Sequence, residues 1–215
     1  MPLVQTITTT DKEQIGLWQI TEELIFLLKK LPKETAKVNS FGSLRRKKEW
    51  LCVRLLLAEM LQKTNVEISY NLHKKPYLKN EMYQISISHS LEYVAIILHE
   101  KKQVGIDVEN IHPRVEKIKQ KFLTKGEQNL LLNQPQFMLT AFWSAKETLY
   151  KWYSKKGVDF KKHLQIVKVK HNKKESEIYS GYIEAIFAKE NIRKQLKINY
   201  RKINNHILTH LVAEI

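Results

Sequence analysis

The sequence contains one cysteine, six glycines and five prolines among its 215 residues. The single cysteine, Cys52, excludes a disulfide framework within the chain and a metal cluster built on several cysteines. No apolar run is long enough to span a bilayer, and the N-terminus lacks the basic and apolar segments of a secretory signal. We therefore expect a soluble cytoplasmic protein with no membrane partner.

Acidic residues are scarce relative to basic ones. Thirty-seven Lys and Arg residues stand against 22 Asp and Glu residues, for a formal net charge of +15. This balance indicates an anionic partner, such as nucleic acid, a phosphorylated small molecule or an acidic protein. A basic surface that serves solubility is the alternative, and charge alone does not choose among them. A hydrophobic share of 43% is sufficient for one large domain or two small ones.

Hydrophobic periodicity predicts a mixture of helices and strands. We expect helices over 21–31 and 43–64, a helical pattern after Pro113, and a long helix over 135–154. The expected strands are 85–90, 93–98, 104–109, 166–169, 178–187, 196–200 and 207–213. These patterns alone predict a mixed α/β protein of one or two domains. Any division into halves should fall at the strand near the middle, residues 104–109.

Residues 104–109 alternate strictly between apolar and other side chains, which is the period of a half-buried strand. Asp107 and Glu109 should therefore project from one face, with Gly105 clearing space beside them. Two like charges so placed repel unless a cation or solvent lies between them. One interpretation is a magnesium site, because this ion prefers carboxylate oxygens and retains several waters. The alternative is a polar edge strand whose acids face water.

Three further features have a functional and a structural interpretation. Glu147 and Lys151 are four residues apart on the long helix, the spacing of an ordinary exposed pair. Arg45 and Arg46 lie near the start of a helix, where cations oppose the dipole; they either bind an anion or form a solvated basic face. Ser88 and His89 end a strand and offer hydrogen bonds to phosphate, although a histidine there is commonly structural.

The acidic strand and the long helix together carry a resemblance. The strand reads Val-Gly-Ile-Asp-Val-Glu, and residues 142–151 read Phe-Trp-Ser-Ala-Lys-Glu-Thr-Leu-Tyr-Lys. In this order the pair resembles the signature of the 4′-phosphopantetheinyl transferases, specifically the larger, monomeric surfactin-synthetase-activating type. The resemblance spans about residues 45–158. It also includes Phe122-Leu123-Thr124 with Glu127, Ser88-His89-Ser90, Lys75-Pro76 and the Arg45–Arg54 helix.

The resemblance implies an α+β fold of two similar halves, residues 1–103 and 104–215, packed as an intramolecular pseudo-dimer. Coenzyme A would lie in the cleft between the halves. The implied reaction is the magnesium-dependent transfer of the 4′-phosphopantetheine arm to a serine of an acidic apo acyl or peptidyl carrier protein. Adenosine 3′,5′-bisphosphate would be released, and the protein would be a monomer.

The resemblance also implies roles for individual residues. Magnesium would be held by three carboxylates: Asp107, Glu109 and Glu147. Lys151 would reach the phosphate or the attacking hydroxyl, and Glu109 is our first choice of general base, with Lys151 as the alternative. The positions that would bind coenzyme A are Arg45 or Arg46, Lys75, Ser88, His89 and Lys151. Lys33 and Lys37 are candidates for the lysines that the family uses just before the arginine helix.

The main rival is a basic nucleic-acid-binding protein without catalysis. Net charge and the Lys/Arg clusters interleaved with Trp and Tyr favour it. Against it, the sequence has no zinc-ligand spacing, no ribonucleoprotein-type strand motif and no glycine-rich phosphate loop. It also leaves Asp107, Glu109 and Glu147 unexplained, because carboxylates repel a phosphate backbone.

Overall fold

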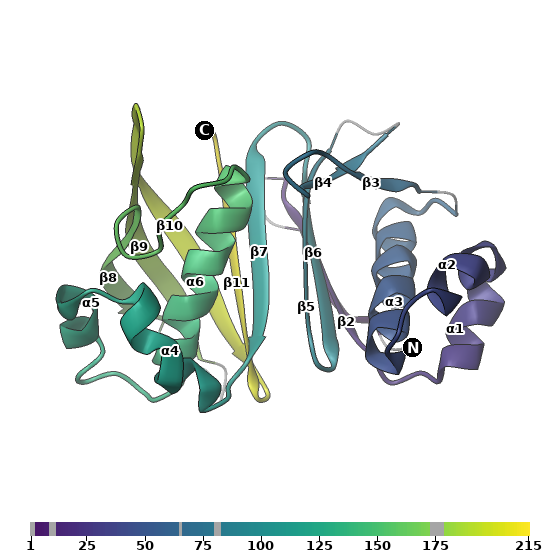
Figure 1. Ribbon diagram of the computed structural model, residues 1–215, viewed down its shortest axis with the longest axis horizontal. Coiled ribbons are helices and arrows are strands. Elements are labelled where there is room, and N and C mark those ends of the chain that lie inside the picture. Colours follow the sequence, from purple (N-terminus) through teal and green to yellow (C-terminus); the bar gives the residue numbers. More distant parts are fainter. Residues whose placement is uncertain (1–2, 9–11, 65, 80–82, 173–178) are drawn as a thin grey trace.

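The computed structural model describes residues 3–8, 12–64, 66–79, 83–172 and 179–215 (Figure 1). Among these residues the strands form three antiparallel sheets. The first has the order β1-β2-β6-β5 and is built from β1 (Leu3–Thr8), β2 (Gln14–Gln19), β5 (Gln84–Ser90) and β6 (Tyr93–His99). The second has the order β7-β11-β10-β9-β8: β7 (Gln103–Asn110), β8 (Leu164–His171), β9 (Ser180–Lys189), β10 (Ile192–Ile203) and β11 (His206–Ala213). A small hairpin joins β3 (Ile68–Tyr70) and β4 (Pro76–Leu78).

Each large sheet carries its helices on one face (Figure 1). The four-stranded sheet is accompanied by α1 (Leu24–Lys30), the 3-10 turn η1 (Pro32–Glu34), α2 (Thr35–Asn39) and α3 (Leu44–Leu61). The five-stranded sheet is accompanied by α4 (Arg114–Phe122), α5 (Lys125–Leu130) and α6 (Met138–Tyr153). Local chemistry supports two of the helix starts. Ser43 caps α3 by accepting the Arg46 backbone N–H, and Thr124 forms a capping box with Glu127 on α5.

The hydrophobic residues divide into three cores. One lies between α3 and the four-stranded sheet, and another between α6 and the five-stranded sheet. The third lies between the two sheets, where Ile15, Leu17 and Ala95 of the first meet Ile106 and Leu208 of the second. The central strands are therefore covered on both faces, which accounts for the nearly unbroken apolar run of β6.

Burial on both faces corrects one sequence expectation. The alternation in residues 104–109 predicts a half-buried strand, but β7 is covered by the third core on one face and by α6 on the other. Burial on both faces also explains why the sequence does not predict β2. Its four central residues, Ile15 to Trp18, are all buried and show no alternation with polar residues. The strands β1 and β2 were not expected from the sequence.

The other expected elements are present, with shifted ends. The helix expected over 43–64 is α3, the one expected over 135–154 is α6, and the one expected over 21–31 is the shorter α1. The four expected C-terminal strands are β8 to β11; β8, β10 and β11 are longer than their sequence patterns, and β9 is shifted by two residues toward the C-terminus. Residue 178, the first of the strand expected over 178–187, lies outside the described residues. In the described part of the chain, no helix is both long and apolar enough to cross a membrane.

Gly105 sets the distance between β7 and α6. A Cβ at this position would lie 2.2 Å from the Thr148 carbonyl oxygen of α6, which is backbone and cannot turn aside. The glycine therefore clears space for the helix rather than for the neighbouring carboxylates.

We expect Gly105→Ala to destabilise the protein by about 1–3 kcal/mol, because overpacking forces the helix and strand apart. For a chain of this size that corresponds to a fall in melting temperature of about 2–4 °C per kcal/mol. Gly42→Ala is the matched control, since an added Cβ there meets no atom within 4 Å. Equal melting temperatures for the two variants would contradict this account of Gly105.

Candidate active site

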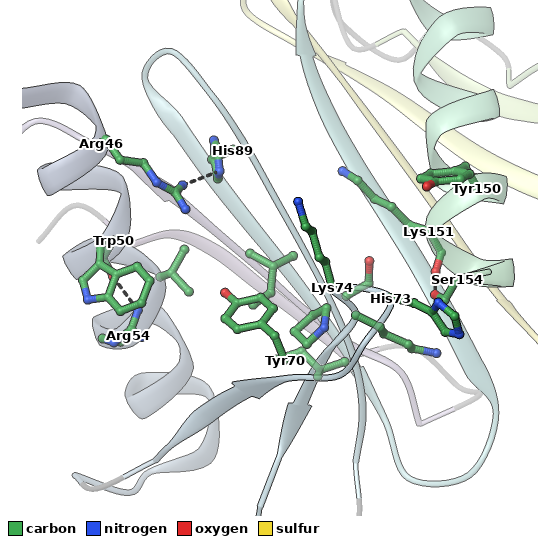
Figure 2. A pocket seen from close by; sticks show the side chains of 16 residues that line it. Arg46, Trp50, Arg54, Tyr70, His73, Lys74, His89, Tyr150, Lys151 and Ser154 are labelled. Carbon is green, nitrogen blue, oxygen red and sulfur yellow. Dashed lines mark hydrogen bonds between the residues drawn. The ribbon is translucent and has the colours of Figure 1, made fainter. Parts of the chain in front are cut away.

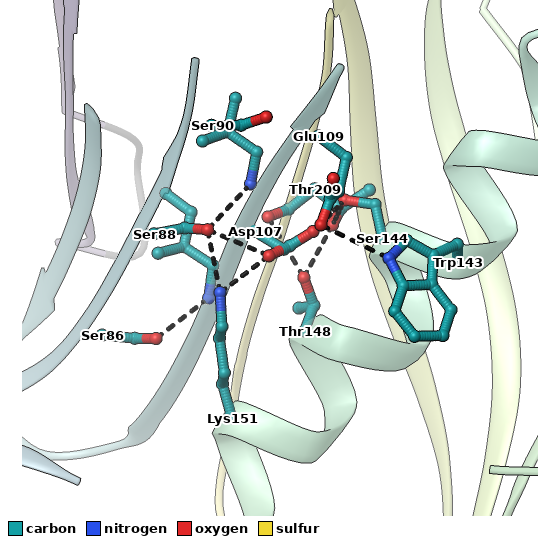
Figure 3. A network of polar contacts seen from close by, with 12 residues as sticks. Ser86, Ser88, Ser90, Asp107, Glu109, Trp143, Ser144, Thr148, Lys151 and Thr209 are labelled. Atoms are coloured by element: carbon teal, nitrogen blue, oxygen red, sulfur yellow. Dashed lines mark hydrogen bonds and ion pairs between the residues drawn. The ribbon is translucent and has the colours of Figure 1, made fainter. Parts of the chain in front are cut away.

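Asp107 is at the centre of a polar cluster between β7 and α6 (Figure 3). Its side chain is buried, with a residue exposure of 2%. Oδ1 accepts hydrogen bonds from Lys151 Nζ at 2.7 Å and from Ser88 Oγ at 2.9 Å, and Oδ2 accepts one from Ser144 Oγ at 2.8 Å. These donors come from β5 and α6, so three elements determine where the carboxylate lies. The alternative interpretation of residues 104–109, a polar edge strand whose acids face water, is therefore wrong for Asp107.

A chain of buried hydroxyls supports Asp107 from behind. Ser144 Oγ lies 2.8 Å from Thr209 Oγ1 on β11, and Thr209 Oγ1 lies 2.6 Å from Thr148 Oγ1 on α6. All three side chains are buried and hydrogen-bonded. Because each member has a partner, the cluster restrains Asp107 without leaving an unpaired polar group in the core.

Glu109 lies two residues further along β7, and its Oε1 accepts a hydrogen bond from the Trp143 indole at 3.3 Å. Burial, followed by the charge of Asp107, raises the pKa of Glu109 to about 7; the Trp143 hydrogen bond opposes this rise. A carboxylate with this pKa exchanges protons near neutral pH, which suits a general base.

Glu147 faces the same region from α6. Burial, followed by the charge of Asp107, raises its pKa to about 7, and Lys151 opposes the rise. The sequence allowed an ordinary exposed pair between Glu147 and Lys151. That interpretation is wrong, because Glu147 is only partly exposed and the salt bridge of Lys151 is to Asp107.

The three carboxylates interact with one another in every combination. The negative charge of Asp107 contributes to the raised pKa of both Glu109 and Glu147, and the charge of Glu147 contributes to that of Glu109. Among the described residues, no group of three or more His, Cys, Asp and Glu side chains is arranged to hold a metal ion. Asp107 instead directs its oxygens at Lys151, Ser88 and Ser144. The donor chemistry nevertheless suits a hard divalent cation, since three carboxylates that act on one another share a single lysine, and such ions prefer carboxylate oxygens.

A pocket of about 250 Å³ opens beside this cluster (Figure 2). It lies between the α3–β5 side of the molecule and α6, and its lining is rich in cations: Arg46, Arg54, Lys74, Lys75 and Lys151. His73, His89 and Tyr70 are also exposed to it. Arg54 stacks on Trp50, with the guanidinium carbon 3.4 Å from the ring centroid. A pocket of this charge is suited to a phosphorylated ligand.

Glu49 organises the α3 end of the pocket. Arg46 Nη1 lies 2.8 Å from His89 Nε2, and His89 Nδ1 lies 3.2 Å from Glu49 Oε2. Although burial works against it, His89 together with Arg45 and Arg46 holds the pKa of Glu49 below its usual value. Of the two candidate arginines, Arg46 lines the pocket, whereas Arg45 lines a separate surface depression with Leu44 and Leu91.

The other residues expected to bind coenzyme A do not all line the basic pocket. Lys75 lines the pocket and donates to Gln103, and burial lowers the pKa of Lys75. Ser88 is buried, and its hydroxyl faces Asp107 and Lys151. Lys33 and Lys37 line a second cavity of about 550 Å³, which shares Trp50 and Arg54 with the basic pocket.

Comparison with known families matches residues 103–209, about half of the chain, to a family described as the 4′-phosphopantetheinyl transferase superfamily. Residues 103–209 belong to this superfamily. The matched segment starts with β7 and includes all of α6, so it contains Asp107, Glu109, Glu147 and Lys151. Membership in the 4′-phosphopantetheinyl transferase superfamily indicates a transferase, and its members typically use Mg²⁺ and coenzyme A. No curated protein matches the chain significantly.

The superfamily segment contains contacts to the carboxylates that the sequence does not predict. Trp143 and Ser144 appear in the sequence only as part of the motif over residues 142–151. Their hydrogen bonds to Glu109 and Asp107 depend on how α6 is rotated over β7. The sequence signal for these contacts is the presence of polar residues, a serine and a threonine, on an otherwise apolar face of α6. Lys146, also in the motif, is fully buried and bonds to Glu127 and to two backbone carbonyls, which is a structural role.

Proposed function

We propose that the protein transfers the 4′-phosphopantetheine arm of coenzyme A to a serine of an apo carrier protein and releases adenosine 3′,5′-bisphosphate. One observation carries this proposal. The superfamily segment gathers Asp107, Glu109, Glu147 and Lys151 beside a basic pocket, which Lys151 lines together with residues of the preceding half. Phosphoryl transfer needs charge neutralisation and positioning more than covalent chemistry from the protein, and these residues supply both.

The three carboxylates are the proposed ligands of Mg²⁺. The bound ion would neutralise charge on the pyrophosphate of coenzyme A and orient it. Asp107 is held by three internal donors, so its position depends little on the ligand. Glu109 and Glu147 contribute the charge that such an ion would compensate.

Arg46, Lys75 and His89 are the proposed contacts for the phosphates and base of coenzyme A, because all three line the pocket. Arg45 would act from outside it, through its salt bridge to Glu49 at 3.4 Å. Lys151 lies at the meeting point of the pocket and the acidic cluster. Its ammonium is therefore placed to stabilise negative charge on the transferring phosphoryl group.

In the proposed reaction, the carrier serine oxygen bonds to the phosphorus that bears the pantetheine arm, and the bond from that phosphorus to the bridging pyrophosphate oxygen breaks. Glu109 accepts the serine proton, directly or through a water. The leaving group takes the bond electrons as adenosine 3′,5′-bisphosphate. Carrier proteins of this class are acidic, so the net charge of +15 would steer them toward the site as well as coenzyme A.

We further propose that residues 1–103 and 104–215 are similar halves of an intramolecular pseudo-dimer, as in the surfactin-synthetase-activating type. The order of elements supports this. In both halves a strand is followed by short helices and then by a long helix, α3 or α6, before the remaining strands. The pocket between the halves takes residues from both, which a monomeric enzyme of this type requires.

Intact-mass measurement tests the function directly. An apo acyl carrier protein is incubated with this protein, coenzyme A and magnesium, and a parallel reaction contains a chelator. A mass gain equal to one phosphopantetheine arm, absent with chelator, is the expected result. No gain with several carriers, together with no magnesium-dependent binding of coenzyme A, would sink the proposal and favour a nucleic-acid-binding role for the basic surface.

The raised pKa values predict a pH dependence of stability without magnesium. Glu109 and Glu147 have folded-state pKa values of about 7 against 4.5 in the unfolded chain, so the folded state binds more protons between these values. Their contribution to stability is therefore present at low pH and is lost as pH rises through about 7. Magnesium should raise the melting temperature more at pH 8 than at pH 5.5, because it competes with these protons.

Glu147→Gln is the matched variant for this measurement. It keeps the side-chain size and removes one titrating group, so the melting temperature should fall less between pH 5.5 and pH 8 than in the parent protein. The response to magnesium at pH 8 should also weaken sharply. If the variant and the parent give identical pH profiles and magnesium responses, Glu147 does not belong to the metal site.

A further inference from the structure

The two large sheets are joined by a row of serine hydroxyls (Figure 3). Strands β5 and β7 lie side by side but belong to different sheets. Alternate residues of β5 point their hydroxyls at the β7 backbone, and each accepts one N–H: Ile106 N to Ser86 Oγ at 3.2 Å, Val108 N to Ser88 Oγ at 3.2 Å, and Asn110 N to Ser90 Oγ at 3.1 Å. The alternation follows from the two-residue period of a strand, and it sets the register of one sheet against the other.

Ser88 has two contacts that its neighbours in the row do not have among the described residues. Its Oγ lies 2.8 Å from Lys151 Nζ and 2.9 Å from Asp107 Oδ1. A hydroxyl has one proton to donate and two lone pairs to accept with. Ser88 therefore donates to Asp107 and accepts from Lys151 and from the Val108 N–H, which uses its full hydrogen-bonding capacity.

This arrangement bears on the role that the sequence resemblance implied for Ser88. A serine that binds phosphate must present a free proton to a phosphate oxygen. The Ser88 hydroxyl is buried and already donates to Asp107, and Ser88 is not among the residues that line the basic pocket. Direct binding of coenzyme A by this hydroxyl would require the bond to Asp107 to break.

We propose that Ser88 is a positioning residue, whose hydroxyl holds the Lys151 ammonium and the Asp107 carboxylate in one geometry and couples that geometry to the packing of the two sheets. Ser88 lies outside residues 103–209, so the half of the chain that precedes the superfamily segment completes its reaction centre. The inference rests on the proposed transfer reaction for its kinetic consequence, and on the contacts of Ser88 for its structural one.

Ser88→Ala and Ser90→Ala form a matched pair for the test. Each variant removes one hydroxyl from the row and leaves one β7 N–H without its partner, but only Ser88→Ala also removes a hydrogen bond to Lys151 and one to Asp107. We expect Ser88→Ala to lower kcat by about tenfold to a hundredfold, the range for losing a residue that orients site ligands. The KM for coenzyme A should stay within about threefold of the parent value, and Ser90→Ala should retain both parameters.

Two kinetic outcomes would overturn the proposal. A raised KM for coenzyme A with unchanged kcat would make Ser88 a ligand of the substrate. An equal loss of kcat in Ser90→Ala would reduce Ser88 to one of several groups that join the sheets. If Ser88→Ala does not fold, Ser88→Cys keeps the size and substitutes a weakly bonding thiol, and the same split between kcat and KM applies.

A second readout does not depend on transfer activity. Reductive methylation of each lysine, followed by mass spectrometry, reports how freely the Lys151 amine reacts. Ser88→Ala should make Lys151 severalfold more reactive than in the parent protein, whereas Ser90→Ala should leave it unchanged. An unchanged Lys151 rate in Ser88→Ala would reject the positioning role. A parent protein that shows no transfer, together with the expected lysine rates, would reject the proposed function and keep the positioning role.

Discussion

Asp107→Ala is expected to reduce phosphopantetheinyl transfer by at least about a thousandfold, which corresponds to about 4 kcal/mol of lost transition-state stabilisation. Asp107 is the most buried of the three carboxylates and the one that contacts Lys151. Its removal takes away a proposed metal ligand and the anchor of the lysine together. Intact mass of the carrier protein, followed over time at saturating coenzyme A, measures the loss.

Asp107→Asn separates charge from shape in the same experiment. The amide keeps the size of the side chain and an oxygen that can still accept from Ser144, but it carries no negative charge. We expect it to be nearly as inactive as the alanine variant, with an unchanged far-UV spectrum. Normal turnover of either variant would remove Asp107 from the active site.

Lys151→Ala is expected to lower kcat by about 10²–10³-fold, the range for losing one group that stabilises charge in the transition state. The KM for coenzyme A should change much less, because the lysine is assigned to the transferring phosphoryl group rather than to the bound ground state. Steady-state kinetics with varied coenzyme A measures both parameters.

The control for Lys151→Ala is Lys168→Ala, which removes the same charge from an exposed position on β8. It should leave both parameters close to those of the parent protein, so that an effect of net charge on carrier binding is accounted for. An increase in KM without loss of kcat in Lys151→Ala would reassign the lysine to ground-state binding of coenzyme A.

Charge balance is the physical reason to expect a divalent cation at this site. Three carboxylates influence one another, and a single ammonium, that of Lys151, contacts one of them. Burial, together with the charge of Asp107, raises the pKa of both Glu109 and Glu147 to about 7. A cation that displaces these protons would convert the acidic cluster beside the basic pocket into a site for pyrophosphate.

The sequence by itself indicated the superfamily and placed the candidate site residues on their elements. Strict alternation placed Asp107 and Glu109 on one face of a strand, and helical periodicity placed Glu147 and Lys151 on one helix, because both patterns follow from local backbone geometry. The motif order then indicated the 4′-phosphopantetheinyl transferase superfamily, which the match over residues 103–209 confirms at that level. The ends of α3 and α6 were also close to expectation, because caps and periodicity are local signals.

The tertiary structure alone decided which partner each polar group has. Lys151 bonds to Asp107 across the interface of α6 and β7 rather than pairing with Glu147 on its own helix, and Ser88 reaches both from a strand of the other sheet. Such contacts join residues 44 to 63 positions apart, and no local pattern encodes them. The burial of β7 on both faces was hidden for the same reason, since what covers a strand depends on how distant elements pack against it.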